Sequence, residues 1–211
     1  MRQIELVSFD AEGTLVTPDF SEAIWHDAIP ALYAQKQGLD FAQAKKFITE
    51  EYNKVGVQRL EWYDIEYWFN CLDLGSSEPV IQSCLNKIVH YPEVSEVLSA
   101  LAGEYPLIVA SGTPSKLLDY LLQDIKSYFV RIFSSISDYR QVKTPEFFLK
   151  ICEEMSVEPG QVMHVGDSWQ FDFVNARQAG IKALYIDRSG ANHQDSLGDL
   201  TRLKDFITAS A

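Results

Sequence analysis

Acidic, hydroxyl-bearing and basic side chains follow apolar segments of this chain at four separate places. Asp10 and Glu12 stand in the stretch VSFDAEGTLV at residues 7–16. Positions 10 and 12 lie on the same side of an extended chain, so one acid could attack a substrate while the other serves its leaving group. The other three places hold Ser111-Gly112-Thr113, Lys143, and Gly166-Asp167-Ser168 with Asp172 a few residues further on.

The segments before these residues have the composition of buried strands. Short apolar runs with β-branched or aromatic residues cover residues 4–9, 107–110, 162–165 and 183–186, and a weaker run covers 130–133. Helix-period patterns separate them after residue 92. This alternation predicts an α/β fold with a three-layer, Rossmann-like core and a parallel sheet covered on both faces. Ligands bind beyond the carboxyl ends of such strands, where the candidate residues lie.

Helix boundaries can be placed from capping residues and glycine. Thr113-Pro114 and Thr144-Pro145 each put a hydroxyl before a proline, which predicts that both threonines cap a helix. Asp40 is expected to cap a helix that begins at residue 41, and Gly180 is expected to be left-handed and to follow a helix end. His164 lies within an apolar run and is expected to be a packed, hydrogen-bonded strand residue.

Residues 18–90 contain no convincing strand and carry long helical patterns, for example over Phe41–Val55. We therefore expect two domains, an α/β core of residues 1–17 and 91–211 and an all-helical insertion of residues 18–90. The insertion is rich in aromatic residues, most of which we expect to pack inside it while one or two face a substrate. These aromatics include Trp25, Trp62, Tyr63, Tyr67, Trp68 and Phe69.

Composition restricts the classes of partner and location. The formal net charge is -12 and the pI is near 4.7, so nucleic acid is repelled and a phosphorylated substrate needs a local excess of positive charge. No apolar segment approaches the length of a membrane span, so no membrane partner is expected. Three widely separated cysteines show neither metal-ligand nor disulfide spacing, which favours a cytoplasmic protein. The oligomeric state is left open.

Taken in order, the four places resemble the motifs of the haloacid dehalogenase-like (HAD) hydrolase superfamily, in its phosphatase branch. The matching residues are the segment DAEGTL at 10–15, Ser111, Lys143, and the segment GDSWQFD at 166–172. One such match alone is weak evidence of relationship, but four in the right order after the right kind of element are specific. The helical insertion between the first two motifs is similar to the cap domain of that superfamily.

The resemblance implies a phosphohydrolase that acts on a small phosphorylated metabolite through an aspartyl-phosphate intermediate on Asp10. Glu12 and Lys143 are the other implied catalytic residues, and Ser111, Gly112 and Thr14 would bind the substrate. Mg²⁺ is the implied cofactor, because carboxylates beside a phosphate need a hard cation. Asp10 and Asp167 would bind it through side chains and Glu12 through its backbone carbonyl. Asp172, a fourth metal-site residue, would orient metal-bound water or hold Lys143.

One position departs from the superfamily pattern and keeps other readings open. Phosphatases of the superfamily usually carry Asp where this chain has Glu12, and the extra methylene shifts the carboxyl by an amount that catalysis can feel. The alternatives are a carbon-halogen hydrolase of the haloacid dehalogenase type, which works without metal, and a catalytically weak binding or regulatory protein. Phosphonate cleavage is less favoured, since that branch usually has alanine at this position and needs a cap lysine.

Overall fold

The computed structural model describes residues 3–190 and 196–209, and the chain divides into two units. The core unit comprises Met1–Val16 and His90–Ala211, and the inserted unit comprises Thr17–Val89. Among the described residues, every helix is too short or too polar to cross a lipid bilayer.

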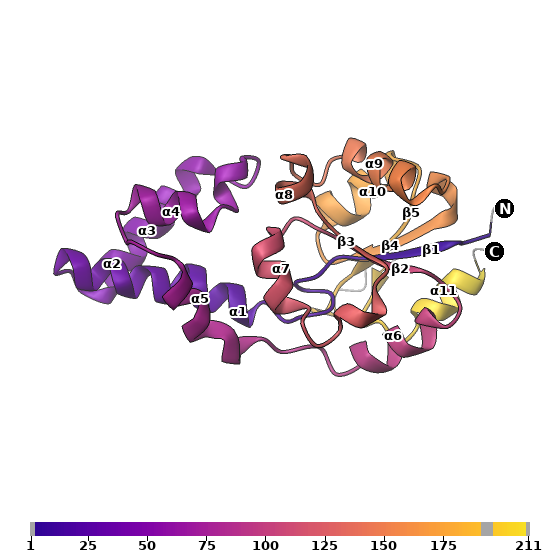
Figure 1. The fold of residues 1–211 in the computed structure, drawn as a ribbon, viewed down its shortest axis with the longest axis horizontal. Coiled ribbons are helices and arrows are strands. Elements are labelled where there is room, and N and C mark those ends of the chain that lie inside the picture. The colour runs from indigo at the N-terminus through magenta and orange to yellow at the C-terminus, as the bar shows by residue number, and fades with distance from the viewer. Residues whose placement is uncertain (1–2, 191–195, 210–211) are drawn as a thin grey trace. The chain divides into compact units, whose positions relative to one another are not determined.

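The core unit is built on a parallel sheet with the strand order β3-β2-β1-β4-β5-β6 (Figure 1). The predicted α/β, Rossmann-like class is confirmed, and all five predicted strands are present. A sixth strand of two residues was not predicted, because so short a segment carries no periodic signal. The strands are β1 (Leu6–Phe9), β2 (Leu107–Ser111), β3 (Arg131–Ser134), β4 (Val162–Gly166), β5 (Lys182–Ile186) and β6 (Ser196–Leu197).

Helices cover both faces of the sheet, with α9 and α10 on one face and α6 and α11 on the other (Figure 1). On the first face, Phe147, Phe148 and Ile151 of α9 pack with Leu6 and Ile108 of the strands in one buried cluster. The helices of the core unit are α6 (Val94–Ala102), α7 (Ser115–Leu121), η4 (Lys126–Tyr128), α8 (Ser135–Tyr139), α9 (Pro145–Met155), η5 (Pro159–Gln161), η6 (Trp169–Val174), α10 (Asn175–Gln178) and α11 (Leu203–Ala209).

The two threonine-proline pairs behave differently. Thr144 caps α9 as predicted, since its hydroxyl accepts a hydrogen bond from the amide of Phe147 at 3.4 Å. The same prediction for Thr113 is wrong, because α7 begins only at Ser115 and the extended Pro114 occupies the capping position without a side-chain bond. The hydroxyl of Thr113 is used at the candidate site instead. Gly180 is left-handed, with φ of 84°, as expected.

The inserted unit is all-helical over residues 17–89, all of which the structure describes. Asp40 caps α3 as predicted, accepting from the amide of Gln43 at 2.9 Å. Aromatic rings of Trp25, Trp62 and Trp68 surround Tyr52, with ring centroids 4.6–6.1 Å away. Its helices are α1 (Asp19–Glu22), η1 (Ala23–Ala28), α2 (Ile29–Gln37), α3 (Phe41–Val55), η2 (Leu60–Trp62), α4 (Ile65–Cys71), α5 (Glu78–Cys84) and η3 (Leu85–Lys87).

The segments that lead into and out of residues 17–89 run side by side. Val16 forms an antiparallel bridge with His90. On one side of this bridge the amide of Tyr91 donates to the carbonyl of Leu15 at 3.1 Å, and on the other the amide of Thr17 donates to the carbonyl of Val89 at 2.8 Å. Backbone hydrogen bonds therefore hold together the two points where the chain leaves and re-enters the core unit.

Candidate active site

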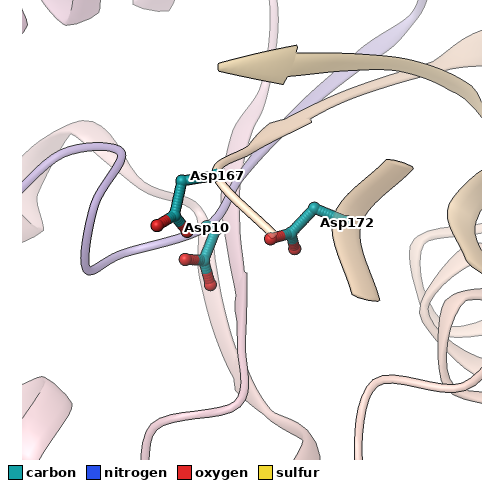
Figure 2. Close-up of side chains that lie close together, drawn as sticks. All are labelled: Asp10, Asp167 and Asp172. Carbon is teal, nitrogen blue, oxygen red and sulfur yellow. The ribbon is translucent and has the colours of Figure 1, made fainter. Parts of the chain in front are cut away.

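The candidate residues gather at the carboxyl edge of three adjacent strands. Asp10 directly follows β1, Ser111 ends β2, and Asp167 directly follows β4. β1 lies between the other two strands, with both pairings parallel, so their ends bring these residues to one place. Figure 2 shows the carboxylates of Asp10 and Asp167 side by side and that of Asp172 pointing toward them.

A tight loop follows Asp10 and is packed against Asp167. The carbonyl of Ala11 accepts from the amides of Leu15 and Val16 at 2.8 and 3.0 Å, which closes the loop over residues 11–16. Gly13 has φ of 75°, and a Cβ placed there would lie 2.0 Å from Oδ2 of Asp167. Only glycine satisfies both the left-handed backbone and this close approach.

Four residues form what we call the buried ion-pair cluster: Asp10, Lys143, His164 and Asp172. The ammonium of Lys143 lies 2.7 Å from Oδ1 of Asp10 and also donates to Oδ1 of Asp172. All four side chains are less than a tenth exposed. Lys143 therefore connects the acid after β1 with an acid of the π-helix η6.

The Asp172 carboxylate is held from several directions. Nε2 of His164 lies 3.0 Å from its Oδ1, and the amide of Ser168 donates to its Oδ2 at 2.9 Å. An ionised carboxylate only accepts hydrogen bonds, so Nε2 of the imidazole carries the proton, while Nδ1 lies 2.8 Å from the Ser8 hydroxyl. A Cβ at Gly166 would lie 2.3 Å from Cγ of Asp172, so this position also requires glycine.

The acids of the site have shifted pKa values. Burial raises the pKa of Asp10 above its ordinary value, because the attraction of Lys143 does not fully offset the lost hydration and the repulsion by Asp172. Lost hydration and the charges of Asp10 and Asp172 raise the pKa of Asp167 to about 7. Burial also opposes ionisation of Asp172, but Lys143 and His164 outweigh it and lower its pKa to about 2.

The raised pKa values of Asp10 and Asp167 fit a site with too little positive charge for its three acids. The carboxylates of Asp10, Asp167 and Asp172 each offer an oxygen, and these atoms lie within 4.8 Å of one another. Three carboxylates and one ammonium leave an excess of negative charge when all four groups are ionised. Hard carboxylate oxygens at this spacing suit a divalent cation of the Mg²⁺ type, which would favour the ionised forms.

Glu12 is hydrogen-bonded to a residue outside the buried ion-pair cluster. Its Oε2 accepts a hydrogen bond of 2.9 Å from the Thr113 hydroxyl. Thr113 is itself fixed, because its amide donates to the Ser111 hydroxyl at 3.2 Å and its carbonyl accepts from the Ser134 hydroxyl at 2.8 Å. We call these two side chains and their hydrogen bond the Glu12–Thr113 pair.

The remaining predicted residues lie at the same edge with different exposure. Ser111 is buried at the end of β2, and Gly112 follows it in the loop before α7. Thr14 lies in the loop after Asp10 and is fully buried. Asp167 as a whole residue is the exposed one of the three acids, while its carboxylate is packed against Gly13. The predicted site residues thus lie on the loops and strand ends at this edge of the sheet, except Asp172, which lies in η6 and reaches the site through Lys143.

Sequence reasoning missed part of the supporting contacts. His164 is a packed, hydrogen-bonded residue of β4, as expected, but its contact with Asp172 was not predicted. Ser8, which lies 2.8 Å from His164 across the β1–β4 pair, was not predicted either, and its only sequence signal was its polarity inside an apolar strand. Thr113 was assigned to a helix cap, and no motif marked it as a partner of a residue 101 positions away.

Comparison with known proteins identifies the family. The model of the haloacid dehalogenase-like hydrolase family matches residues 4–180, which is most of the chain. The chain therefore belongs to this family of hydrolases, as its motifs predicted.

Individual relatives are more distant. The chain is 26% identical over 197 residues to a glyceraldehyde 3-phosphate phosphatase of Pyrococcus abyssi, covering 87% of this chain and 81% of that protein. It is 27% identical over 73 residues to the GMP/IMP nucleotidase YrfG of Escherichia coli, but this match covers 35% of this chain and only 32% of the relative's length. A crystal structure of a HAD phosphatase from Thermococcus onnurineus shares the fold, with a TM-score of 0.86 at 24% identity over 97% of this chain and 98% of that one.

Proposed function

We propose that this chain is a Mg²⁺-dependent phosphohydrolase of small phosphorylated metabolites that works through an aspartyl-phosphate on Asp10. The observation that carries the proposal is the meeting of Asp10, Lys143, Asp167 and Asp172 at one strand edge with Glu12 two residues from the nucleophile. Two relatives named for phosphatase and nucleotidase activity support a phosphate ester as substrate.

Asp10 is suited to be the nucleophile. In the first step one of its carboxylate oxygens would attack phosphorus, a P–O bond would form, and the P–O bond to the leaving alcohol would break. Lys143 contacts Oδ1 of Asp10 at 2.7 Å and keeps the carboxylate oriented as the anionic phosphate approaches. Asp172 keeps Lys143 in place, and His164 keeps Asp172 in place.

Glu12 is suited to move the protons. In its protonated form it would give a proton to the leaving alkoxide as the P–O bond breaks. In the second step the ionised carboxylate would take a proton from the water that attacks the aspartyl-phosphate, which restores Asp10 and releases inorganic phosphate. Thr113 holds Glu12 through a neutral hydroxyl, which supports either protonation state.

The other proposed residues bind the cation and the substrate. Asp10 and Asp167, with the carbonyl of Glu12, would hold Mg²⁺, and Asp172 would act beside them. When bound, Mg²⁺ supplies positive charge that lets an anionic phosphate enter an acidic site. The Ser111 hydroxyl, the Gly112 amide and Thr14 would receive the phosphoryl oxygens.

The inserted unit is the proposed cap, and it would select the substrate. Its helical fold and its aromatic side chains fit that role. A cytoplasmic location is also part of the proposal. The three free cysteines agree with a reducing compartment.

A screen of phosphorylated metabolites tests the function. The purified chain is incubated with sugar phosphates, triose phosphates and nucleoside monophosphates in Mg²⁺ or in excess EDTA, and released phosphate is measured. We expect Mg²⁺-dependent release from at least one class. Halide release from 2-haloacids in EDTA would replace the proposal with a dehalogenase, and tight ligand binding without turnover would replace it with a binding protein.

A further inference from the structure

Arg188 makes several contacts that the mechanism above does not use. It lies in the turn after β5, beyond the residues that the family model matches. Its Nε donates to the carbonyl of Gly13 at 3.1 Å, and its Nη2 donates to the carbonyl of Thr14 at 2.7 Å. One guanidinium thus binds two consecutive carbonyls of the loop that carries Glu12.

The loop does not use these two carbonyls in its own closure. The loop's internal bonds use the carbonyls of Ala11 and Val16, the latter accepting from the amide of Gly13 at 2.8 Å. The planar fork of Arg188 fixes the peptide planes after Gly13 and Thr14 together. It therefore fixes the loop at the point where Gly13 meets the carboxylate of Asp167.

Arg188 is itself held on two sides. Its guanidinium lies 3.4 Å from the centroid of the Tyr91 ring, and Nη2 lies 2.8 Å from Oε1 of Glu93. The side chains of Arg188 and Glu93 are only 19% and 13% exposed, so their ion pair is shielded from water. Tyr91 also binds the loop directly, through its amide and the carbonyl of Leu15.

The turn that presents Arg188 is also ordered by local hydrogen bonds. Oδ1 of Asp187 accepts from the amide of Ser189 at 3.0 Å and from its hydroxyl. Together with Tyr91 and Glu93, this turn gives the guanidinium one orientation in which its donors face the loop over residues 11–16.

We propose that Arg188 is a positioning residue that holds the loop over residues 11–16 so that Glu12 keeps the geometry needed for proton transfer. This inference rests on the proposed phosphohydrolase function.

Lysine at position 188 keeps the charge beside Glu93 but lacks the two-pronged guanidinium that binds both carbonyls. Because misplacement of a catalytic group by about 1 Å can lower a rate by about 10²-fold, the Arg188→Lys variant loses about 10–100-fold in kcat. KM is expected to change little, because the guanidinium is already engaged by the two loop carbonyls, Glu93 and Tyr91.

The experiment compares wild type with Arg188→Lys, Arg188→Met and Glu93→Gln. Arg202→Lys is the matched control, because Arg202 is exposed and pairs with Asp205 on the surface. Steady-state kinetics are normalised to the folded fraction, and hydrogen exchange of peptides covering residues 11–17 is followed by mass spectrometry. We expect both Arg188 variants to lose kcat and to exchange these amides roughly tenfold faster, with Glu93→Gln between them and wild type.

The two measurements separate the ways in which the inference can fail. Unchanged exchange in both Arg188 variants would show that the arginine does not hold the loop. Faster exchange with unchanged kcat would show that the loop's order is irrelevant to turnover, and equal loss of kcat in Arg202→Lys would remove the specificity of the effect. Absence of phosphatase activity in wild type would instead overturn the proposed function, and exchange would still decide whether Arg188 orders the loop.

Discussion

The buried ion-pair cluster, which contains Asp10, and the Glu12–Thr113 pair, two residues further along the chain, are built differently. In the cluster, charged groups are packed out of water and each has a charged or imidazole partner. In the pair, the Glu12 carboxylate accepts a hydrogen bond from the neutral hydroxyl of Thr113, and the backbone amide of Thr113 is held by Ser111. The cluster fixes charge and structure together, whereas the pair is a hydrogen bond between the carboxylate proposed to transfer protons and an uncharged side chain. Changes in the cluster should therefore affect folding as well as rate, and changes in the pair should affect rate alone.

Asp10 belongs to the cluster and is the proposed nucleophile, so its replacement should have the largest effect. Asp10→Asn removes the attacking carboxylate with little change of volume, and we expect kcat to fall by roughly 10⁴-fold or more. Phosphate release under saturating substrate measures it. Asp119→Asn, at an exposed acid paired with Lys126, is the control and should retain wild-type activity. Full activity in the purified Asp10 variant would rule out the covalent mechanism.

Lys143 tests whether the cluster supports the fold. Lys143→Met leaves Asp10 and Asp172 buried without their ammonium, and we expect the free energy of unfolding to fall by about 3–5 kcal/mol. Urea denaturation in the absence of Mg²⁺ measures this change. Lys126→Met removes a lysine from an exposed ion pair and should change stability by less than about 1 kcal/mol. Equal effects in the two variants would erase the contrast between buried and exposed pairs.

Glu12 is the proposed acid and base of the Glu12–Thr113 pair. Glu12→Gln keeps the shape and an acceptor for Thr113 but cannot transfer a proton, so kcat for an alkyl phosphate should fall by about 10²-fold or more. The loss should be smaller with p-nitrophenyl phosphate, whose leaving group needs no proton. Stability should be unchanged.

Replacing Glu12 by aspartate, whose carboxylate is shorter by one methylene, tests whether the chain is an enzyme or a binding protein. Glu12→Asp pulls the carboxyl away from the Thr113 hydroxyl, so we expect a rate equal to or below that of wild type. A gain of several orders of magnitude would contradict the assignment of Glu12 as the working acid and base, and would favour the binding or regulatory reading.

Asp167 links metal binding to pH. Its pKa is raised from 3.8 to about 7, so the stability that its protonated form contributes is present below pH 3.8 and is lost as pH rises through 7. We therefore expect the melting temperature of the metal-free protein, measured relative to that of Asp167→Asn, to be lower at pH 8 than at pH 5.5.

Mg²⁺ should reverse this loss. At one hundred times its dissociation constant the ion would add about 2.7 kcal/mol of stability, which is roughly 5–10 °C in a chain of this size. The gain should grow as pH rises, because fewer protons must be displaced. Differential scanning fluorimetry with Mg²⁺ or EDTA measures it, and a gain of equal size in Asp167→Asn would show that the ion binds elsewhere.

Thr113 should give the smallest effect. Thr113→Val removes the hydroxyl without changing the size of the side chain, and kcat should fall by about tenfold because Glu12 loses its orientation. The double variant with Glu12→Gln should be no slower than Glu12→Gln alone. Thr201→Val, at an exposed hydroxyl that bonds Asp199, is the matched control. Additive losses in the double variant would mean that Thr113 acts independently of Glu12.

What could be predicted from the sequence is the part of the structure that local signals specify. Strands β1 to β5 and the residues at their carboxyl ends follow from apolar runs and turn residues, which are local signals. Thr113 could not be placed because its proline neighbour suggested a cap, whereas the extended Pro114 delays the helix to Ser115 and frees the hydroxyl. Arg188 carries no motif, and its role depends on contacts with residues up to 175 positions away.

Loop packing is a further case in which sequence alone was insufficient. Glycine at positions 13 and 166 was read as part of a motif. Its physical reason, the space taken by the carboxylates of Asp167 and Asp172, appears only when the strand ends are brought together.

The paired segments at Val16 and His90 have a consequence for how such a chain can diversify. Because the insertion departs and returns at one antiparallel bridge, its length is not constrained by the sheet. A helical segment of another size could be exchanged at this junction as a cassette, and the strand order would stay the same. With the inserted unit as the proposed cap, specificity would vary by replacement of this segment and catalysis by single substitutions around Asp10.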